Sequence, residues 1–234
     1  MIGGCLGRAL IAAGGMLVLA GPGLAADASV AGLVAPFLKA QSDGTLGTVA
    51  AKAHAEPIRP SAGPAPQPSV SITLVPYSVA LETELDTVKA GLRDSLDAYL
   101  LAVARIEDTR VDYQRALLEA GAGELVRTQL TDGQGAAQFG DLPVGDWLVL
   151  AWREGGHISK RFKLRDTEAS RYPNVPSNVT YSVVTYWRTR VTVRAGETAE
   201  VTMSDRNVWL TAARQEGGTP VTPQRPQGAR KQRR

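Results

Sequence analysis

Cysteine and histidine are nearly absent from this chain of 234 residues. Cys5 is its only cysteine, and His54 and His157 are its only histidines. Once a segment containing Cys5 is removed, no disulfide can form, so the core alone must stabilise the fold. The shortage of both residue types argues against a Ser-His-Asp or Cys-His nucleophile and against a zinc site. We therefore expect no enzyme activity and no bound cofactor.

Long apolar runs are also lacking, apart from one near the N-terminus. Arg8 is the only charged residue before Asp27, residues 9–20 are apolar apart from glycine, and small residues occupy the end of this region. This pattern is typical of a cleaved secretory signal peptide, here residues 1–26. The alternative is a retained anchor, but the run falls short of the ~20 apolar residues that span a bilayer. We expect a secreted or periplasmic protein of a bacterial envelope.

A basic domain face is missing as well. The formal net charge is +3, but the last ten residues carry +5 and Arg8 carries +1, which leaves the body at −3. A nucleic-acid-binding domain concentrates Lys and Arg on a folded surface, so the sequence argues against a nucleic-acid partner. The basic tail belongs to a segment, 213–234, that is predicted to be disordered. Its membrane contact is expected to be weak at most.

Large apolar residues are scarce between residues 50 and 68. A short helix is predicted within 29–41, interrupted by Pro36, and residues 50–68 are mainly Ala, Pro, Ser and Gly. A stretch of this composition cannot bury enough surface to offset its ordering entropy. Residues 27–68 are therefore interpreted as a disordered Ala- and Pro-rich linker. Alternation in residues 70–75 then predicts the first strand of a β-domain.

Residues 79–120 change to a helical period. Apolar side chains recur every three or four residues without a proline, and Gly121 and Gly123 follow. A single helix would extend ~55–60 Å, about twice the length of a small sandwich, so it either breaks, with Gly91 the weakest point, or projects. We predict a helix or helix pair lying on the sandwich. The alternative is self-association as a coiled coil, and the candidate interaction residues are Leu92, Leu96, Tyr99, Val103 and Ile106.

The remaining chain has the pattern of a β-sandwich. A tight turn at residues 131–135 and a second turn at 142–145 flank a short strand. Residues 147–152 are apolar on both faces, which predicts a strand covered on both sides. Glycines 155 and 156 are expected to end it, followed by a short strand near residues 162–164, a loop at 165–177 and a strand at 179–187. Residues 191–203 are predicted to form a hairpin that bends at Gly196.

These motifs resemble carboxypeptidase regulatory-like domains, which belong with the transthyretin-like (prealbumin-like) β-sandwiches. The first half of the resemblance rests on Asp132, Gly135, Phe139, Leu142, Pro143, Gly145 and Trp147, and the second on Val191, Val193, Gly196, Thr198 and Val201. It covers residues 70–73 and 124–210, and the helical segment is a departure from it. The resemblance implies a mainly β, Ig-like sandwich at 69–212 with a helical insertion at 79–120, and a non-catalytic module.

The fold that this resemblance implies also includes an enzymatic relative, the hydroxyisourate hydrolases. These enzymes use histidines and a Tyr-Arg-Gly-Ser-like C-terminus. This chain has two histidines and ends in Arg233 and Arg234, so that activity is not carried over. Acid–base work by Asp132, Asp141 and Asp146 is a further alternative. Aspartates in turns are ordinarily there to bond the backbone, and their spacing matches no EF-hand calcium loop.

Two functions remain open from the sequence. The first is a protein-interaction or structural module of the envelope, with the helical stripe binding an envelope protein or a second copy. The second is a carbohydrate-binding module, because exposed aromatic rings stack on sugars. Its candidate stacking residues are Tyr186, Trp187 and Trp209.

Overall fold

The computed structural model describes residues 23–57, 59, 63–161 and 178–216. Its N-terminal half contains α1 (Gly23–Ser42), β1 (Leu46–Ala55), β2 (Ala65–Pro66), β3 (Ser71–Pro76), α2 (Val79–Gly91) and α3 (Leu96–Glu119). The short 3-10 helix η1 (Gly123–Leu125) follows, and then β4 (Arg127–Leu130), β5 (Ala136–Pro143), β6 (Gly145–Arg161), β7 (Asn178–Val193), β8 (Thr198–Met203) and β9 (Leu210–Glu216).

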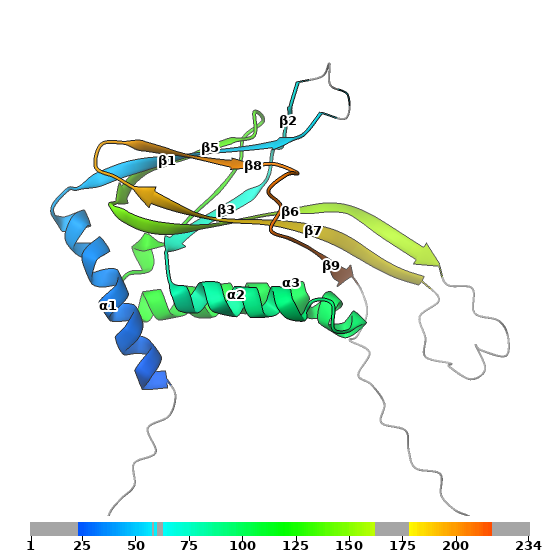
Figure 1. Cartoon of the computed structure of the whole chain (residues 1–234), viewed down its shortest axis with the longest axis horizontal. Helices are drawn as coiled ribbons and strands as arrows, with labels where there is room; N and C mark the ends of the chain where they lie inside the picture. The colour runs from blue at the N-terminus through cyan, green and yellow to red at the C-terminus, as the bar shows by residue number, and fades with distance from the viewer. Residues whose placement is uncertain (1–22, 58, 60–62, 162–177, 217–234) are drawn as a thin grey trace, which may run out of the picture.

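The strands form two sheets that face each other. The small sheet has the order β2-β1-β5, and β8 pairs with β1 in parallel. The large sheet has the order β4-β3-β6-β7-β9, and its neighbouring strands are antiparallel. Figure 1 shows α2 and α3 as a third layer, against the face of the large sheet that is turned away from the small one. The prediction of a mainly β protein with two sheets and a helical addition is confirmed.

Strand β6 is buried on both of its faces. Trp147, Val149 and Ala151 are at most 1% exposed, and Leu148 and Leu150 on the other face are at most 6% exposed. Trp147 meets the ring of Phe37 from α1 edge-on, with the ring centroids 5.3 Å apart. Each large side chain buried in this way contributes about 1.5–3 kcal/mol relative to an exposed one. The prediction that this strand is covered on both sides is confirmed.

The helical segment is two helices with a break after Gly91, as one of the two sequence alternatives predicted. The hydroxyl of Ser78 accepts from the amide of Leu81 at the start of α2, and Ser95 Oγ accepts from Ala98 N at 3.0 Å to cap α3. The apolar stripe packs on the large sheet, and Tyr113 Oη donates to the carbonyl of Pro76 at 2.9 Å. The pair therefore lies on the sandwich.

The prediction of a disordered linker at 27–68 is wrong for residues 27–42 and 46–55. Residues 23–42 form α1 and residues 46–55 form β1, which lies inside the small sheet with Val49, Ala51 and Ala53 at most 2% exposed. The inner face of β1 uses mainly alanine, so the period-two pattern holds without the large side chains that ordinarily mark a strand. The strand at 71–76 is accordingly β3, and the helices follow the third strand, not the first.

The predicted hairpin at 191–203 is also wrong. A turn does occur at Gly196, whose φ is +68°, but β7 stays in the large sheet while β8 crosses to the small sheet and pairs with β1. The connection is tied to the start of β1 because Gly196 N donates to Leu46 O and Thr48 N donates to Glu197 O. Turn residues identify a reversal of the chain but not the partner of the next strand.

Other boundaries differ from the sequence prediction. β6 continues past Gly155 and Gly156 to Arg161, with a shift of its register on β7 between Glu154 and His157. The last strand, β9, ends at Glu216, four residues beyond the predicted domain boundary. The signal peptide up to residue 22, the strand and loop predicted at 162–177, and the basic tail from residue 217 lie outside the described residues.

The turn at residues 131–135 depends on one glycine. Asp132 Oδ1 accepts from the amides of Gln134 and Ala136, as expected for an aspartate in a turn. Gly135 has a φ of +72°, and a Cβ there would lie 2.2 Å from the carbonyl oxygen of Ala53. A side chain is excluded both by the backbone conformation and by the neighbouring strand.

Replacing Gly135 by alanine is therefore expected to lower the free energy of unfolding by more than about 2 kcal/mol, since it adds strain and displaces β1. The control is Gly133→Ala in the same turn, where a Cβ meets nothing within 4 Å. Urea unfolding followed by tryptophan fluorescence compares the two variants. Equal losses of stability would contradict the role assigned to Gly135.

Candidate functional site

An open groove lies between the edges of the two sheets. It has a volume of about 360 Å³ and is lined by Val126, Arg127, Thr128 and Gln129 on one wall and by Phe139, Gly140 and Asp141 on the other. The first wall is β4 with the residue before it, and the second is β5. The two strands meet at the 131–135 turn, where Asp132 N donates to Ala136 O, and they diverge from there into different sheets.

Within the residues that the structure describes, strand β4 has a free backbone edge along this groove. Thr131 N donates to Val70 O, and the register continues with Gln129 opposite Ile72 and Arg127 opposite Leu74. Bonded pairs recur at every second residue of an antiparallel ladder, so Gln129 and Arg127 direct their backbone groups to β3. Thr128 and Leu130 direct theirs away from β3. The side-chain contact of Thr73 with Thr128, 3.0 Å between their hydroxyl oxygens, fits a non-bonded pair at that position.

The side chains of β4 leave this edge accessible. Thr128, Gln129 and Leu130 are exposed, and Leu130 is 64% exposed although it is apolar. Natural edge strands are ordinarily protected by lysine, proline, a bulge or a covering segment. β4 contains no lysine and no proline. Its pairing with β3 has no register shift, so it contains no bulge. Its edge is available for pairing.

The opposite wall, β5, has an irregular backbone that hinders pairing with a further strand. The register of β5 on β1 shifts between Gly47 and Val49, which places Gly140 and Asp141 at a bulge. Asp141 has a φ of +54°, in the left-handed region that residues with a side chain seldom adopt. A bulge twists an edge and interrupts its ladder. Of the two walls, only β4 offers a regular edge.

Arg127 supplies the positive charge of the groove, and Asp141 on the opposite wall supplies a negative one. Its side chain is half-buried, and among the described residues its Nε atom is buried without a hydrogen-bond partner. A buried donor without an acceptor costs about 1–3 kcal/mol. An acceptor delivered by a bound partner would remove that cost.

The predicted interaction stripe on the helices is turned inward. Val103 and Ile106 are 2% and 3% exposed, and Leu92 and Tyr99 are half-buried. The side chain of Leu96 lies outside what the structure describes. The stripe was predicted as an interface because its apolar period is strong, but the same period is satisfied by packing on the large sheet. Val103 and Ile106 therefore belong to the core, and Leu92 and Tyr99 are partly covered.

Two of the three predicted stacking residues are buried. Tyr186 and Trp187 are 5% and 3% exposed, and Trp187 Nε1 donates to the carbonyl of Ser204 at 2.8 Å. Burial raises the pKa of Tyr186. Trp209 is half-buried, with the guanidinium of Arg188 4.7 Å and the ammonium of Lys89 5.5 Å from the centre of its ring. Tyr186 and Trp187 cannot stack on a sugar, and Trp209 is already contacted by two cations.

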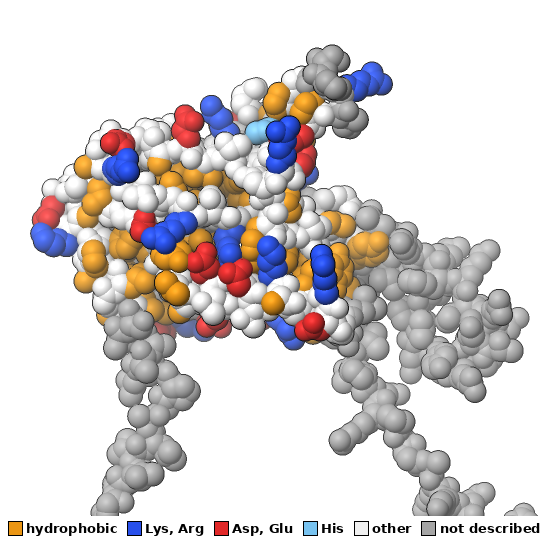
Figure 2. All heavy atoms as spheres, in the orientation of Figure 1, with side chains coloured by type: hydrophobic (Ala, Val, Ile, Leu, Met, Phe, Trp, Pro, Cys, Tyr) orange, Lys and Arg blue, Asp and Glu red, His pale blue; other side chains and the backbone are white. Residues whose placement is uncertain are grey.

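Charged side chains join the helices to the large sheet. Arg188 on β7 pairs with Asp86 at 2.9 Å and with Glu82 at 3.7 Å, both on α2. Arg214 on β9 pairs with Glu107 of α3 and with Glu154 of β6. Figure 2 shows acidic and basic side chains gathered between the sheet and the helices. Because these charges are paired within the chain, they hold the layers together and do not form a ligand site.

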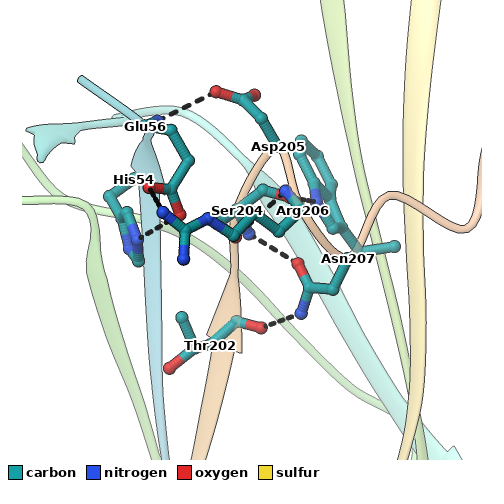
Figure 3. Close-up of polar contacts among 8 residues, drawn as sticks. His54, Glu56, Thr202, Ser204, Asp205, Arg206 and Asn207 are labelled. Atoms are coloured by element: carbon teal, nitrogen blue, oxygen red, sulfur yellow. Dashed lines mark hydrogen bonds and ion pairs between the residues drawn. The ribbon is translucent and has the colours of Figure 1, made fainter. Parts of the chain in front are cut away.

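A second polar cluster fixes the connection from β8 to β9. Asp205 Oδ2 accepts from the amide of Glu56, and Arg206 Nη2 lies 3.0 Å from Glu56 Oε2 (Figure 3). His54 Nε2 is 3.7 Å from the other carboxylate oxygen of Glu56. The side chains point at one another and at the backbone, so this cluster anchors the end of β1. His54, which the sequence places in a linker, is part of it.

The three aspartates considered for acid–base work have separate surroundings. Asp132 bonds turn amides, Asp141 lies at the bulge of β5, and Asp146 on β6 accepts from Thr192 Oγ1 at 2.6 Å and from Arg190 Nη2 at 2.5 Å. The hydrogen bond from Thr192, together with Arg190, lowers the pKa of Asp146. Among the residues that the structure describes, no group of three or more His, Cys, Asp or Glu side chains is arranged to hold a metal.

Comparison with known proteins leaves the family open. No protein-family model matches the chain, and no curated protein matches it. The chain resembles a candidate carbohydrate-binding protein from Pseudomonas aeruginosa, with 13% identity and a TM-score of 0.37 over 68% of this chain and 88% of the other. It also resembles the minor pilin of the gram-positive pathogen Streptococcus agalactiae, with 12% identity and a TM-score of 0.24 over 76% of this chain and 100% of the pilin. Both likenesses are too distant to assign a fold or a function.

No helix within the described ranges is both long enough and apolar enough to cross a membrane.

The lowered pKa of Asp146 predicts a pH-dependent contribution to stability. A carboxylate with a depressed folded-state pKa stabilises the fold above its unfolded value, about 3.9, and this contribution is lost as the pH falls through the folded-state pKa. Asp146→Asn should therefore be less stable than the wild type at pH 7, and the difference should vanish in strong acid. Urea unfolding of both proteins between neutral and acidic pH measures it. A difference that stays constant over this range would refute the assignment.

Proposed function

We propose that this protein is a non-catalytic interaction module of the bacterial envelope, and that it binds an extended segment of a partner protein by strand addition to β4. The observation that carries the proposal is the free backbone edge of Thr128 and Leu130 beside the groove. In strand addition, backbone hydrogen bonds provide affinity and alternate side chains provide selectivity. A secreted or periplasmic location, and membership of the carboxypeptidase regulatory-like family, are parts of this proposal that rest on the sequence.

The groove also defines the chemistry of the partner. An added strand would present an acceptor to Arg127, and an acidic side chain satisfies both its charge and its buried Nε–H. Leu130, next to the turn, offers an apolar contact on the same edge. The partner segment is thus expected to be extended, to lack proline at the positions that pair, and to carry Asp or Glu opposite Arg127.

The carbohydrate alternative receives no comparable support. Its candidates Tyr186 and Trp187 are buried, and the ring of Trp209 is contacted by Arg188 and Lys89. Sugar-binding sites of the stacking type need a ring that is open to solvent. We therefore advance strand addition alone.

Selection of random peptides displayed on phage against the full chain tests the proposal. Selected peptides should carry an acidic residue and bind the wild type. Thr128→Pro removes an amide that points away from β3, so it should weaken binding at least about tenfold while the fold is kept. Thr128→Ala keeps the amide and should bind within about twofold of the wild type.

Hydrogen exchange on the complex provides the second measurement. The amides of Thr128 and Leu130 should become protected when a selected peptide is bound, because they would enter a ladder. Peptides that bind Thr128→Pro as tightly as the wild type would refute strand addition at this edge. A glycan that binds the chain and leaves these amides unprotected would favour the carbohydrate alternative.

A further inference from the structure

The outer face of α3 carries an apolar stripe of its own. It lies opposite the side on which Val103, Ile106 and Leu117 are buried. We define the outer stripe as six residues separated by alternating steps of three and four: Leu101, Ala104, Asp108, Val111, Arg115 and Leu118. All six are exposed, and the three large apolar members, Leu101, Val111 and Leu118, are 43%, 41% and 68% exposed.

The spacing of the outer stripe is that of a helix–helix contact. Ala104, Val111 and Leu118 are seven residues apart, and steps of three and four keep a seam along one side of a helix. An exposed helix face is ordinarily polar. A single exposed apolar residue needs no explanation, but a row in register with the helical repeat is the pattern of an interface.

The stripe is complementary to itself. Val111 lies midway between Ala104 and Leu118, so a two-fold axis at Val111 sets the small residue of one copy against the large residue of the other. An interface with two-fold symmetry must match itself in this way. We propose that two copies of this chain associate through the outer stripe, with their α3 helices antiparallel about Val111.

The charged members of the stripe select the antiparallel direction. Asp108 lies three residues before Val111 and Arg115 four residues after it. In the antiparallel arrangement each Asp108 comes opposite the Arg115 of the other copy, offset by one residue, or about 1.5 Å along the axis. A parallel arrangement would place like charges opposite each other, which is unfavourable. The charges therefore favour the same symmetry as the apolar residues.

The pairing of Arg115 within its own helix does not oppose this arrangement. Arg115 Nη1 lies 2.8 Å from Asp112 Oδ1, and the two side chains are 60% and 66% exposed. An exposed pair of this kind is worth little, so Arg115 can contact Asp108 of the second copy at small cost. The interface is one helix pair, at the small end of specific interfaces, so the dimer is expected to be weak and in equilibrium with the monomer.

Sedimentation equilibrium of the full chain tests the proposal. Between about 1 and 200 µM, where small interfaces associate, the average mass should rise towards twice that of the chain. Leu118→Glu and Val111→Glu should each weaken association at least tenfold, because they place a charge in the seam. Val79→Glu is the matched control: Val79 is 67% exposed, like Leu118, but belongs to α2. It should leave association unchanged.

A charge exchange tests the direction of the helices. Asp108→Arg alone and Arg115→Asp alone should each weaken association several-fold, and the double variant should restore it, since it re-forms the pair with its signs reversed. Circular dichroism of every variant checks that the fold is kept. This inference is independent of strand addition, so Thr128→Pro should dimerise like the wild type.

Two results would overturn the inference. One is a chain that stays monomeric over the whole concentration range. The other is a dimer that withstands both Leu118→Glu and Val111→Glu, because its interface would then lie elsewhere. Failure of the double variant to recover would reject the antiparallel pairing of Asp108 with Arg115.

Discussion

Neither face of β6 can be left to solvent. With Trp147 and Val149 on one face and Leu148 and Leu150 on the other, all almost fully buried, the large sheet has to be covered twice. The small sheet and α1 cover one face, and α2 with α3 covers the other. The insertion of two helices after β3 is therefore required by the strand that they shield, and the third layer is part of the core.

Because both faces of the large sheet are covered, side chains that the sequence suggests as interaction surfaces are buried inside the chain. The strong apolar stripe of the helices is used inside the chain, and so are Tyr186 and Trp187, which the large sheet buries. Within the described residues, pairing or packing stops at the free edge of β4 and at the outer face of α3, and these are the surfaces proposed for partners. Both are modest in size, which fits a module whose contacts are selective but reversible.

Features that depend on neighbouring residues could be predicted from the sequence, and features that depend on residues far away in the chain could not. The turn at Asp132, the break at Gly91 and the two buried faces of β6 each follow from a few neighbouring residues. β1 was missed because alanines fill its inner face, and their burial depends on strands far away in the sequence. The pairing of β8 was predicted wrongly for a related reason, since a turn does not specify a partner. The groove depends on strand order, which no segment of the sequence encodes by itself.

The parallel pairing of β1 with β8 has a consequence for how the chain reaches its fold. Thr48 lies opposite Thr198, about 150 residues later, and closing so long a loop is entropically costly and slow. Until β8 is available, β1 lacks a neighbour on that side, and an unpaired strand invites association with other chains. A nascent or truncated chain that ends before residue 198 therefore exposes a vulnerable edge at its N-terminal end. Completion of the C-terminal part protects the beginning of the protein.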